Sequence, residues 1–273
     1  MRVIMRGDCF SHYTYTRNAT LFGNNDDNSD RGPSKFFQDE KVRSDTLLLS
    51  KDNKTPQFEE IKDYYLEKFR KDPSYSSNIH YFKHQLDRNT MDINDADLII
   101  MDNYSDMNFT AIRNLQKEYQ IWIDNALINT EVIDIFDEIP SQDLINKNTY
   151  VKKGHLTLDE ALEFQIKLIE HYRNNNGNIP VLYFNQPINY FPNLEFRSDF
   201  NKLGKMLEER VENFYLGEID ESDIINDGLA ALHFTPMTYR KALFSALDKG
   251  LSKYLPRADI EPRIRREYRD EET

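Results

Sequence analysis

The stretch RVIMRGDCF, residues 2–10, decides the fold expected of this 273-residue chain. Its apolar residues 3–5 lie between two arginines, and a run this short is typical of a strand buried on both faces. Gly7 then permits a tight turn, so Cys9 is expected at the start of the helix that follows. This first strand, turn and helix set the pattern for the rest of the chain.

Strands and helices alternate in the sequence that follows. Short apolar runs predict further strands at 46–49, 98–101, 120–123, 180–184 and 214–216. Amphipathic patterns predict helices at 58–69, 109–119, 158–172, 194–214 and 237–251. Such alternation predicts an α/β fold, a three-layer α/β/α sandwich with a mainly parallel, flavodoxin-like sheet.

The chain is expected to form a single α/β domain over residues 1–255. A polar segment at about 18–43, rich in Asn, Asp, Gly and Ser, predicts a long loop or insertion. Residues 256–273 are strongly charged and are expected to form a C-terminal tail or an exposed helix.

Composition narrows the function classes. The net charge of −12 disfavours a general surface for nucleic acid or anionic lipid. No window approaches eighteen apolar residues and the N-terminus lacks a signal-peptide pattern, so we expect a cytoplasmic protein without a membrane span. The single cysteine excludes an internal disulfide framework and a cysteine-based zinc site.

Reactive or polar side chains follow several predicted strands. Cys9 follows the first strand, Asn103 follows the strand at 98–101, and Asn185 follows the one at 180–184. The carboxyl ends of parallel strands meet at one edge of the sheet, where α/β proteins place their ligand sites. Free N–H groups at a helix start would favour a thiolate at Cys9 and hold an oxyanion. Alternatively, Cys9 is a small buried hydrophobe and the asparagines are turn residues.

His233 lies near the C-terminus within DGLAALHFTP, residues 227–236. Thr235 and Pro236 are typical of an N-cap and a first helical position, which places His233 in the loop before a helix. A histidine there could act as general base towards a nucleophile at the end of the first strand. The alternative is a histidine with a structural role.

These motifs, in this order, resemble the SGNH (GDSL-like) hydrolase superfamily. The closest resemblance is to its cysteine-bearing branch, which includes capsule polysaccharide acetyltransferase-like proteins. Residues 7–9, Gly-Asp-Cys, match the nucleophile block, Asp102-Asn103 matches the block whose Asn lines the oxyanion hole, and His233 matches the terminal histidine block. The markers span residues 7–233 and thus most of the chain.

The resemblance implies a catalytic role for Cys9 as nucleophile and His233 as base. The acid that the family places three positions before the histidine is Ala230 here, so a Cys–His dyad is implied, with Asp227 as the nearest upstream acid. The other implied site residues, which would hold the oxyanion or the substrate, are Gly7, Asp8, Phe10, Gly23, Asn103 and Asn185.

We therefore expect an acyltransferase or esterase that works through a cysteine thioester. The resemblance implies a sugar or polysaccharide precursor as substrate and acyl-CoA as donor, with no bound cofactor and no metal. Two alternatives remain: a binding or assembly protein that has lost the chemistry, and a metal-dependent sugar transferase using Asp102 and Asp106. His80 and His84 have the spacing of a zinc pair on a helix but lack further ligands around them.

Overall fold

A computed structural model describes residues 1–7, 9–23, 36–38, 43–50, 93–108, 110–114, 120–123, 150–187, 192–227 and 234–271. The chain divides into two compact units. Unit 1 contains Met1–Glu40, Ile93–Tyr104 and Ile169–Thr273, and unit 2 contains Lys41–Asp92 and Ser105–Leu168. That residues 1–255 form a single domain stays a prediction.

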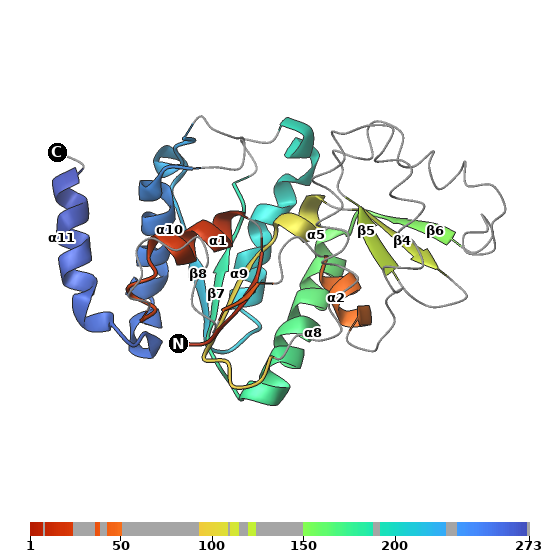
Figure 1. Cartoon of the computed structure of the whole chain (residues 1–273). Coiled ribbons are helices and arrows are strands. Elements are labelled where there is room, and N and C mark those ends of the chain that lie inside the picture. The colour runs from red at the N-terminus through yellow and green to blue at the C-terminus, as the bar shows by residue number, and fades with distance from the viewer. Residues whose placement is uncertain are drawn as a thin grey trace, which may run out of the picture. The chain divides into compact units, whose positions relative to one another are not determined.

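Unit 1 is built on a parallel sheet (Figure 1). Its strands are β1 (Val3–Arg6), β2 (Phe36–Gln38), β3 (Leu98–Asp102), β7 (Val181–Phe184) and β8 (Phe214–Gly217). They lie in the order β2-β1-β3-β7-β8, and every neighbouring pair is parallel. This is the doubly wound, flavodoxin-like order, whose crevice lies at the carboxyl ends between β1 and β3. The expected α/β fold class is thereby confirmed.

One face of the sheet packs against α1 (Cys9–Arg17) and α10 (Pro236–Asp248), which lie side by side (Figure 1). A row of paired residues crosses this face: Met5, Ile100, Leu182 and Tyr215. All four belong to a buried apolar cluster that includes residues of both helices. Because successive residues of a strand point to opposite faces, the same strands can bury a second surface.

The opposite face packs against α9 (Leu203–Glu208). Gly204 of this helix lies so close to β8 that a Cβ would stand 2.6 Å from Leu216 Cδ1. Leu203 and Leu207 are fully buried. Helices therefore cover both faces of the parallel sheet, as expected for strands that are apolar on both sides.

Unit 1 ends in helical turns. After the 3₁₀ segments Leu251–Tyr254 and Ala258–Ile260 comes α11 (Glu261–Glu271). Arg265 of α11 donates hydrogen bonds to the Phe244 carbonyl and to Asp248 of α10, at 3.3 and 2.8 Å. Much of the expected charged tail is thus a helix anchored to α10.

Unit 2 contains a three-stranded antiparallel sheet in the order β5-β4-β6. Its strands are β4 (Thr110–Asn114), β5 (Gln120–Ile123) and β6 (Tyr150–Gly154), and its helices include α2 (Ser44–Ser50), most of α5 (Tyr104–Asn108) and the first half of α8 (Leu158–Asn176). At the start of α8, Thr157 and Glu160 exchange the two hydrogen bonds of the expected capping box, at 2.9 and 3.2 Å.

The predicted strand at 46–49 is wrong, because these residues lie in helix α2. The Ser44 N–H donates to Asp106 at 2.6 Å, and the Leu47 N–H donates to the Arg43 carbonyl at 3.0 Å, as in a helical turn. A short run of three leucines is compatible with either structure, and leucine is a good helix former.

The predicted helix at 109–119 is also wrong where the structure describes it. Residues 110–114 form β4, which pairs antiparallel with β5 and β6. The β-branched Thr110 and Ile112 favour this outcome. The strand at 120–123 is confirmed, but it belongs to the antiparallel sheet of unit 2 and not to the parallel sheet.

Only part of the long helix predicted at 194–214 is an α-helix. Residues 192–202 form a 3₁₀ segment with a non-helical break at Arg197, and α9 ends at Glu208. Asn213 then takes a positive φ of 49°, a conformation that asparagine tolerates, immediately before β8. The expected loop at 18–43 contains the edge strand β2, which the sequence did not predict. The helix expected at 58–69 lies outside the described residues.

In the part of the chain that the structure describes, no helix has both the length and the apolar character needed to cross a membrane.

Candidate functional site

The turn from β1 to α1 brings Gly7, Ser11 and Asp102 together at the carboxyl edge of the parallel sheet. Ser11 Oγ donates to Asp102 Oδ2 at 2.7 Å. A Cβ at residue 7 would lie 2.5 Å from Ser11 Oγ and nearer still to Asp102 Oδ2, so only glycine fits without displacing them. The sequence predicts that another group approaches the backbone of Gly7 closely, and in the structure that group is the buried Ser11–Asp102 pair.

Asp102 is a fully buried carboxylate that holds the starts of two helices. Its Oδ2 accepts the Ser11 N–H of α1 at 3.3 Å, and its Oδ1 accepts the Tyr104 N–H of α5 at 3.1 Å. Arg6, also buried, donates to the Asp102 carbonyl at 3.2 Å. Carboxylates are stabilising at helix starts, because the free N–H groups and the helix dipole point towards them.

Asn103 is fully buried and binds the chain that follows β7. Its side-chain oxygen accepts the Gln186 N–H at 2.7 Å, and its amide nitrogen donates to the Phe200 carbonyl at 3.1 Å and to Asn185 Oδ1 at 3.5 Å. These bonds fix β3 to the segment after β7. That Asn103 donates to an oxyanion stays a prediction, and it would require these bonds to rearrange.

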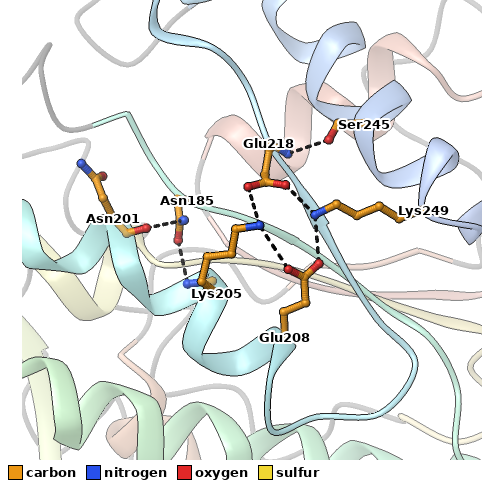
Figure 2. A network of polar contacts seen from close by, with 8 residues as sticks. Asn185, Asn201, Lys205, Glu208, Glu218, Ser245 and Lys249 are labelled. Carbon is orange, nitrogen blue, oxygen red and sulfur yellow. Dashed lines mark hydrogen bonds and ion pairs between the residues drawn. The ribbon is translucent and has the colours of Figure 1, made fainter.

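Asn185, at the end of β7, holds the start of α9 (Figure 2). Its oxygen accepts the Gly204 N–H at 3.1 Å, and its nitrogen donates to the Asn201 carbonyl at 2.8 Å. It therefore acts as a cap from another part of the chain, since Lys202 at the N-cap position of α9 makes no side-chain cap. A role in substrate binding stays a prediction.

Gln186 differs from its two asparagine neighbours. Its side chain is fully buried, and neither its amide nitrogen nor its oxygen has a hydrogen-bond partner among the described residues. A buried amide without a partner typically costs about 1–3 kcal/mol. Gln186 is thus the carboxamide at this edge whose side-chain hydrogen-bonding groups are left unused among the described residues.

A ring of ion pairs closes the β8 side of the edge (Figure 2). Glu218, directly after β8, contacts Lys205 of α9 at 2.6 Å and Lys249 at the end of α10 at 2.7 Å. Glu208 contacts the same two lysines, at 3.4 and 2.9 Å. The Glu218 N–H also donates to Ser245 Oγ at 3.2 Å. The ring therefore ties the end of β8 to helices on both faces of the sheet.

The ring shifts the pKa values of two of its members, Glu218 and Lys205. Burial alone would raise the pKa of Glu218, but the hydrogen bonds from Lys205 and Lys249 outweigh it and lower that pKa. The hydrogen bond with Glu218 raises the pKa of Lys205. Both shifts favour the charged forms of Glu218 and Lys205.

The chain on either side of residues 228–233 is anchored beside the start of α10. Asn226 and Phe234 form an isolated antiparallel bridge, and the Thr235 N–H donates to the Ile225 carbonyl at 2.8 Å. Thr238 accepts the Ile225 N–H at 3.1 Å. The two ends of the segment 226–234 therefore lie side by side at the first turn of α10.

Aromatic rings connect Phe234, just before α10, to the start of α1. Phe10 and Phe234 are both buried, and their ring centroids lie 5.8 Å apart. Phe10 also contacts Phe184 at the end of β7, at 5.3 Å. Phe10 follows Cys9 in the chain and Phe234 follows His233. The structure thus brings together the residues that adjoin the predicted nucleophile and the predicted base.

The remaining predicted site residues are placed as follows. Cys9 is the first residue of α1, and its side chain is not among the described parts. Asp8 and His233 lie outside the described residues, and Asp227 is exposed. Gly23, with a φ of +82°, lies against Pro256, whose ring atoms are the ones a Cβ there would meet. The structure therefore groups Gly7, Phe10, Asn103 and Asn185 around the strand ends and gives Gly23 a different neighbour.

The acidic residues considered for a metal are engaged by protein groups. Asp102 accepts the bonds described above, and Asp106 in unit 2 accepts Ser44 and Gln165, the latter at 2.6 Å. Among the described residues, no group of three or more His, Cys, Asp or Glu side chains is arranged to hold a metal ion. His80 and His84 lie outside them.

Sequence reasoning missed two residues of this region. Ser11 and Tyr239 each bind a site segment from a distance, Ser11 through Asp102 and Tyr239 through Phe234. Ser11 lies in the first turn of α1, two positions after Cys9. A polar residue at such a position in a buried helix indicates that it has a hydrogen-bond partner elsewhere in the chain. Tyr239 carries no comparable signal.

Comparison with protein-family models, curated proteins and solved structures found no match for this chain. The resemblance to the SGNH superfamily accordingly rests on the residues themselves.

Proposed function

We propose that this chain is an acyltransferase or esterase that forms a thioester on Cys9, with His233 as general base, in the manner of the cysteine-bearing SGNH proteins it resembles. The proposed substrate is a sugar or polysaccharide precursor, with acyl-CoA as donor and the cytoplasm as location. The strand order and the place of β1 at the switch point agree with this proposal.

The contact between Phe10 and Phe234 carries the proposal. Phe10 follows the proposed nucleophile and Phe234 follows the proposed base, and their rings are in contact. Because consecutive Cα atoms are about 3.8 Å apart, the Cα of each proposed catalytic residue is about that far from the Cα of its phenylalanine. The two residues are separated by more than two hundred positions in the chain, and an unrelated cysteine and histidine have no reason to adjoin the same buried ring pair.

The start of α1 supports the proposed role of Cys9. The first four N–H groups of a helix have no partner within it, and Asp102 takes that of Ser11. The N–H groups of Cys9 and Phe10 precede it in the same turn. They are the proposed donors to the oxyanion, in a site where preorganised donors contribute most to rate.

The proposed reaction has two halves. In the first half, His233 takes the thiol proton and the Cys9 sulfur attacks the acyl carbon. The bond from that carbon to the leaving sulfur or oxygen then breaks, and His233 gives its proton to the leaving atom. His233 then takes a proton from the acceptor hydroxyl, or from water, whose oxygen attacks the thioester. The new ester or acid leaves, and Cys9 regains its proton.

The test is acyl transfer from acetyl-CoA, followed by mass spectrometry of the acylated protein. Wild type should gain one acetyl group on Cys9, whereas Cys9→Ala should gain none and His233→Ala should gain it far more slowly. His12→Ala is the matched control, because His12 lies three residues after Cys9 on α1. Acylation that persists in Cys9→Ala would refute the mechanism, and loss in His12→Ala alone would assign the base to His12.

A second candidate is a binding or assembly protein that keeps this fold without the chemistry. It is favoured by Asn103, whose amide is buried and bonded to Phe200 and Asn185, and by Ala230 in place of the family's acid. Alkylation with iodoacetamide at neutral pH distinguishes the two. A Cys9 that reacts no faster than free cysteine, with or without His233, would favour the binding protein.

A further inference from the structure

Tyr239 lies in the first turn of α10, and its ring lies between the two segments of the proposed site. The ring is 2% exposed and its centroid is 5.1 Å from that of Phe10 and 6.1 Å from that of Phe234. Tyr13 of α1 packs against it as well, at 5.6 Å. One side chain of α10 thus contacts both the residue after Cys9 and the residue after His233.

The Tyr239 hydroxyl adds a directional contact to this packing. It accepts a hydrogen bond from the Phe234 N–H at 3.0 Å, in a buried position. The neighbouring Thr238 binds the other end of the loop, where it accepts the Ile225 N–H and donates to the Asp223 carbonyl at 2.9 Å. The first turn of α10 therefore fixes the backbone on both sides of residues 227–233.

We infer that Tyr239 is a positioning residue for the pair Cys9 and His233. This inference rests on the proposed function. The N–H that Tyr239 binds belongs to the peptide that joins His233 to Phe234, so the hydroxyl restrains the orientation of that peptide. The same ring restrains Phe10. A general base needs hydrogen-bond reach to its proton donor, and a clamp on both backbones preserves that distance.

The experiment is the pH dependence of Cys9 alkylation by iodoacetamide in the full-length protein. Tyr239→Phe removes the hydroxyl and keeps the ring. We expect it to raise the apparent pKa of Cys9 by about one unit, which lowers the alkylation rate near pH 7 about tenfold. Tyr254→Phe is the matched control, because it removes a half-buried hydroxyl that donates to Asn213 at 2.9 Å in the same unit. It should leave the profile unchanged.

A double variant separates positioning from a general loss of stability. In His233→Ala the base is absent, so adding Tyr239→Phe should change the alkylation profile no further. An unchanged profile in Tyr239→Phe, when His233→Ala does shift it, overturns the role of Tyr239 and leaves the proposed function intact. A profile that His233→Ala does not shift overturns the proposed function itself. Equal effects of Tyr239→Phe with and without His233 would likewise refute the inference.

Discussion

Replacing Gly7 with alanine tests the packing at the turn between β1 and α1. Among the described glycines, Gly23, Gly177 and Gly250 have positive φ and Gly7 does not, so its backbone would accept alanine. Where space allows, this substitution typically stabilises a protein by about 0.4–1 kcal/mol, because the unfolded chain loses freedom. The structure predicts the opposite sign here.

The magnitude follows from the Ser11–Asp102 pair. The new Cβ would lie 2.5 Å from Ser11 Oγ against an ordinary contact of 3.4 Å, so the hydroxyl must move by about 0.9 Å, the difference between the two. The carboxylate must move further. Asp102 accepts both the hydroxyl and the N–H of Ser11, at 2.7 and 3.3 Å. Bonds to a charged group contribute about 1.5–3 kcal/mol each, so losing both would cost about 3–6 kcal/mol, which is the upper limit for this substitution.

Urea unfolding followed by circular dichroism measures this loss. Gly177→Ala is the control, because a Cβ there meets nothing within 4 Å and the φ of +71° alone should cost about 1 kcal/mol. In a Ser11→Ala background, Gly7→Ala should cost less, since the hydroxyl and its bond are already gone. A Gly7→Ala protein as stable as wild type, or no less stable than Gly177→Ala, would show that the turn is not packed as described.

Three further substitutions probe the same edge. Glu218→Gln should cost no more than about 1 kcal/mol at pH 7, because its partners are partly exposed. The pKa of Glu218 is lowered from 4.5 in the folded protein, so its contribution to the free energy of unfolding is full above pH 4.5. This contribution is lost as the pH falls through the folded-state pKa. If urea titrations show the same cost of Glu218→Gln at low pH, this reasoning is contradicted. Gln186→Met should raise the free energy of unfolding by about 1–3 kcal/mol, whereas Asn103→Ala, which leaves the Gln186 N–H unpaired, should lower it by a similar amount or more. A loss of stability in Gln186→Met would mean that its amide has a partner.

The parallel sheet could be predicted from the sequence because its central strands are buried on both faces. Such strands appear as short continuous apolar runs, and 98–101 and 180–184 match β3 and β7 to within a residue. The run at 46–49 has the same appearance, yet it lies in a helix whose first residue, Ser44, binds a carboxylate 62 positions away. An apolar run indicates that the segment is buried. The residue that decides whether it forms a strand or a helix is often far away in the sequence.

The candidate site could be predicted in part for the same reason. Strand ends can be read locally, so the sequence indicated Asn103 and Asn185 as residues of the carboxyl edge. What each side chain binds there could not be read. The capping of α9 by Asn185 and the contact of Ser11 with Asp102 join residues 19 and 91 positions apart. Nothing in either sequence stretch identifies its partner.

The carboxyl edge has two halves of different character, and this difference locates the proposed chemistry. On the β7–β8 side, Asn103 and Asn185 bond to backbone and each other, and Glu218 sits in a closed ring of ion pairs. Groups held this way form a rigid wall, and their hydrogen bonds would have to break before they met a substrate. On the β1–α10 side, the rings of Phe10 and Phe234 make apolar contacts with each other and with the ring of Tyr239. A buried aromatic wall beside the residues that precede Phe10 and Phe234 suits a nucleophile and its base, so the β1–α10 side is where the proposed acyl transfer should be sought.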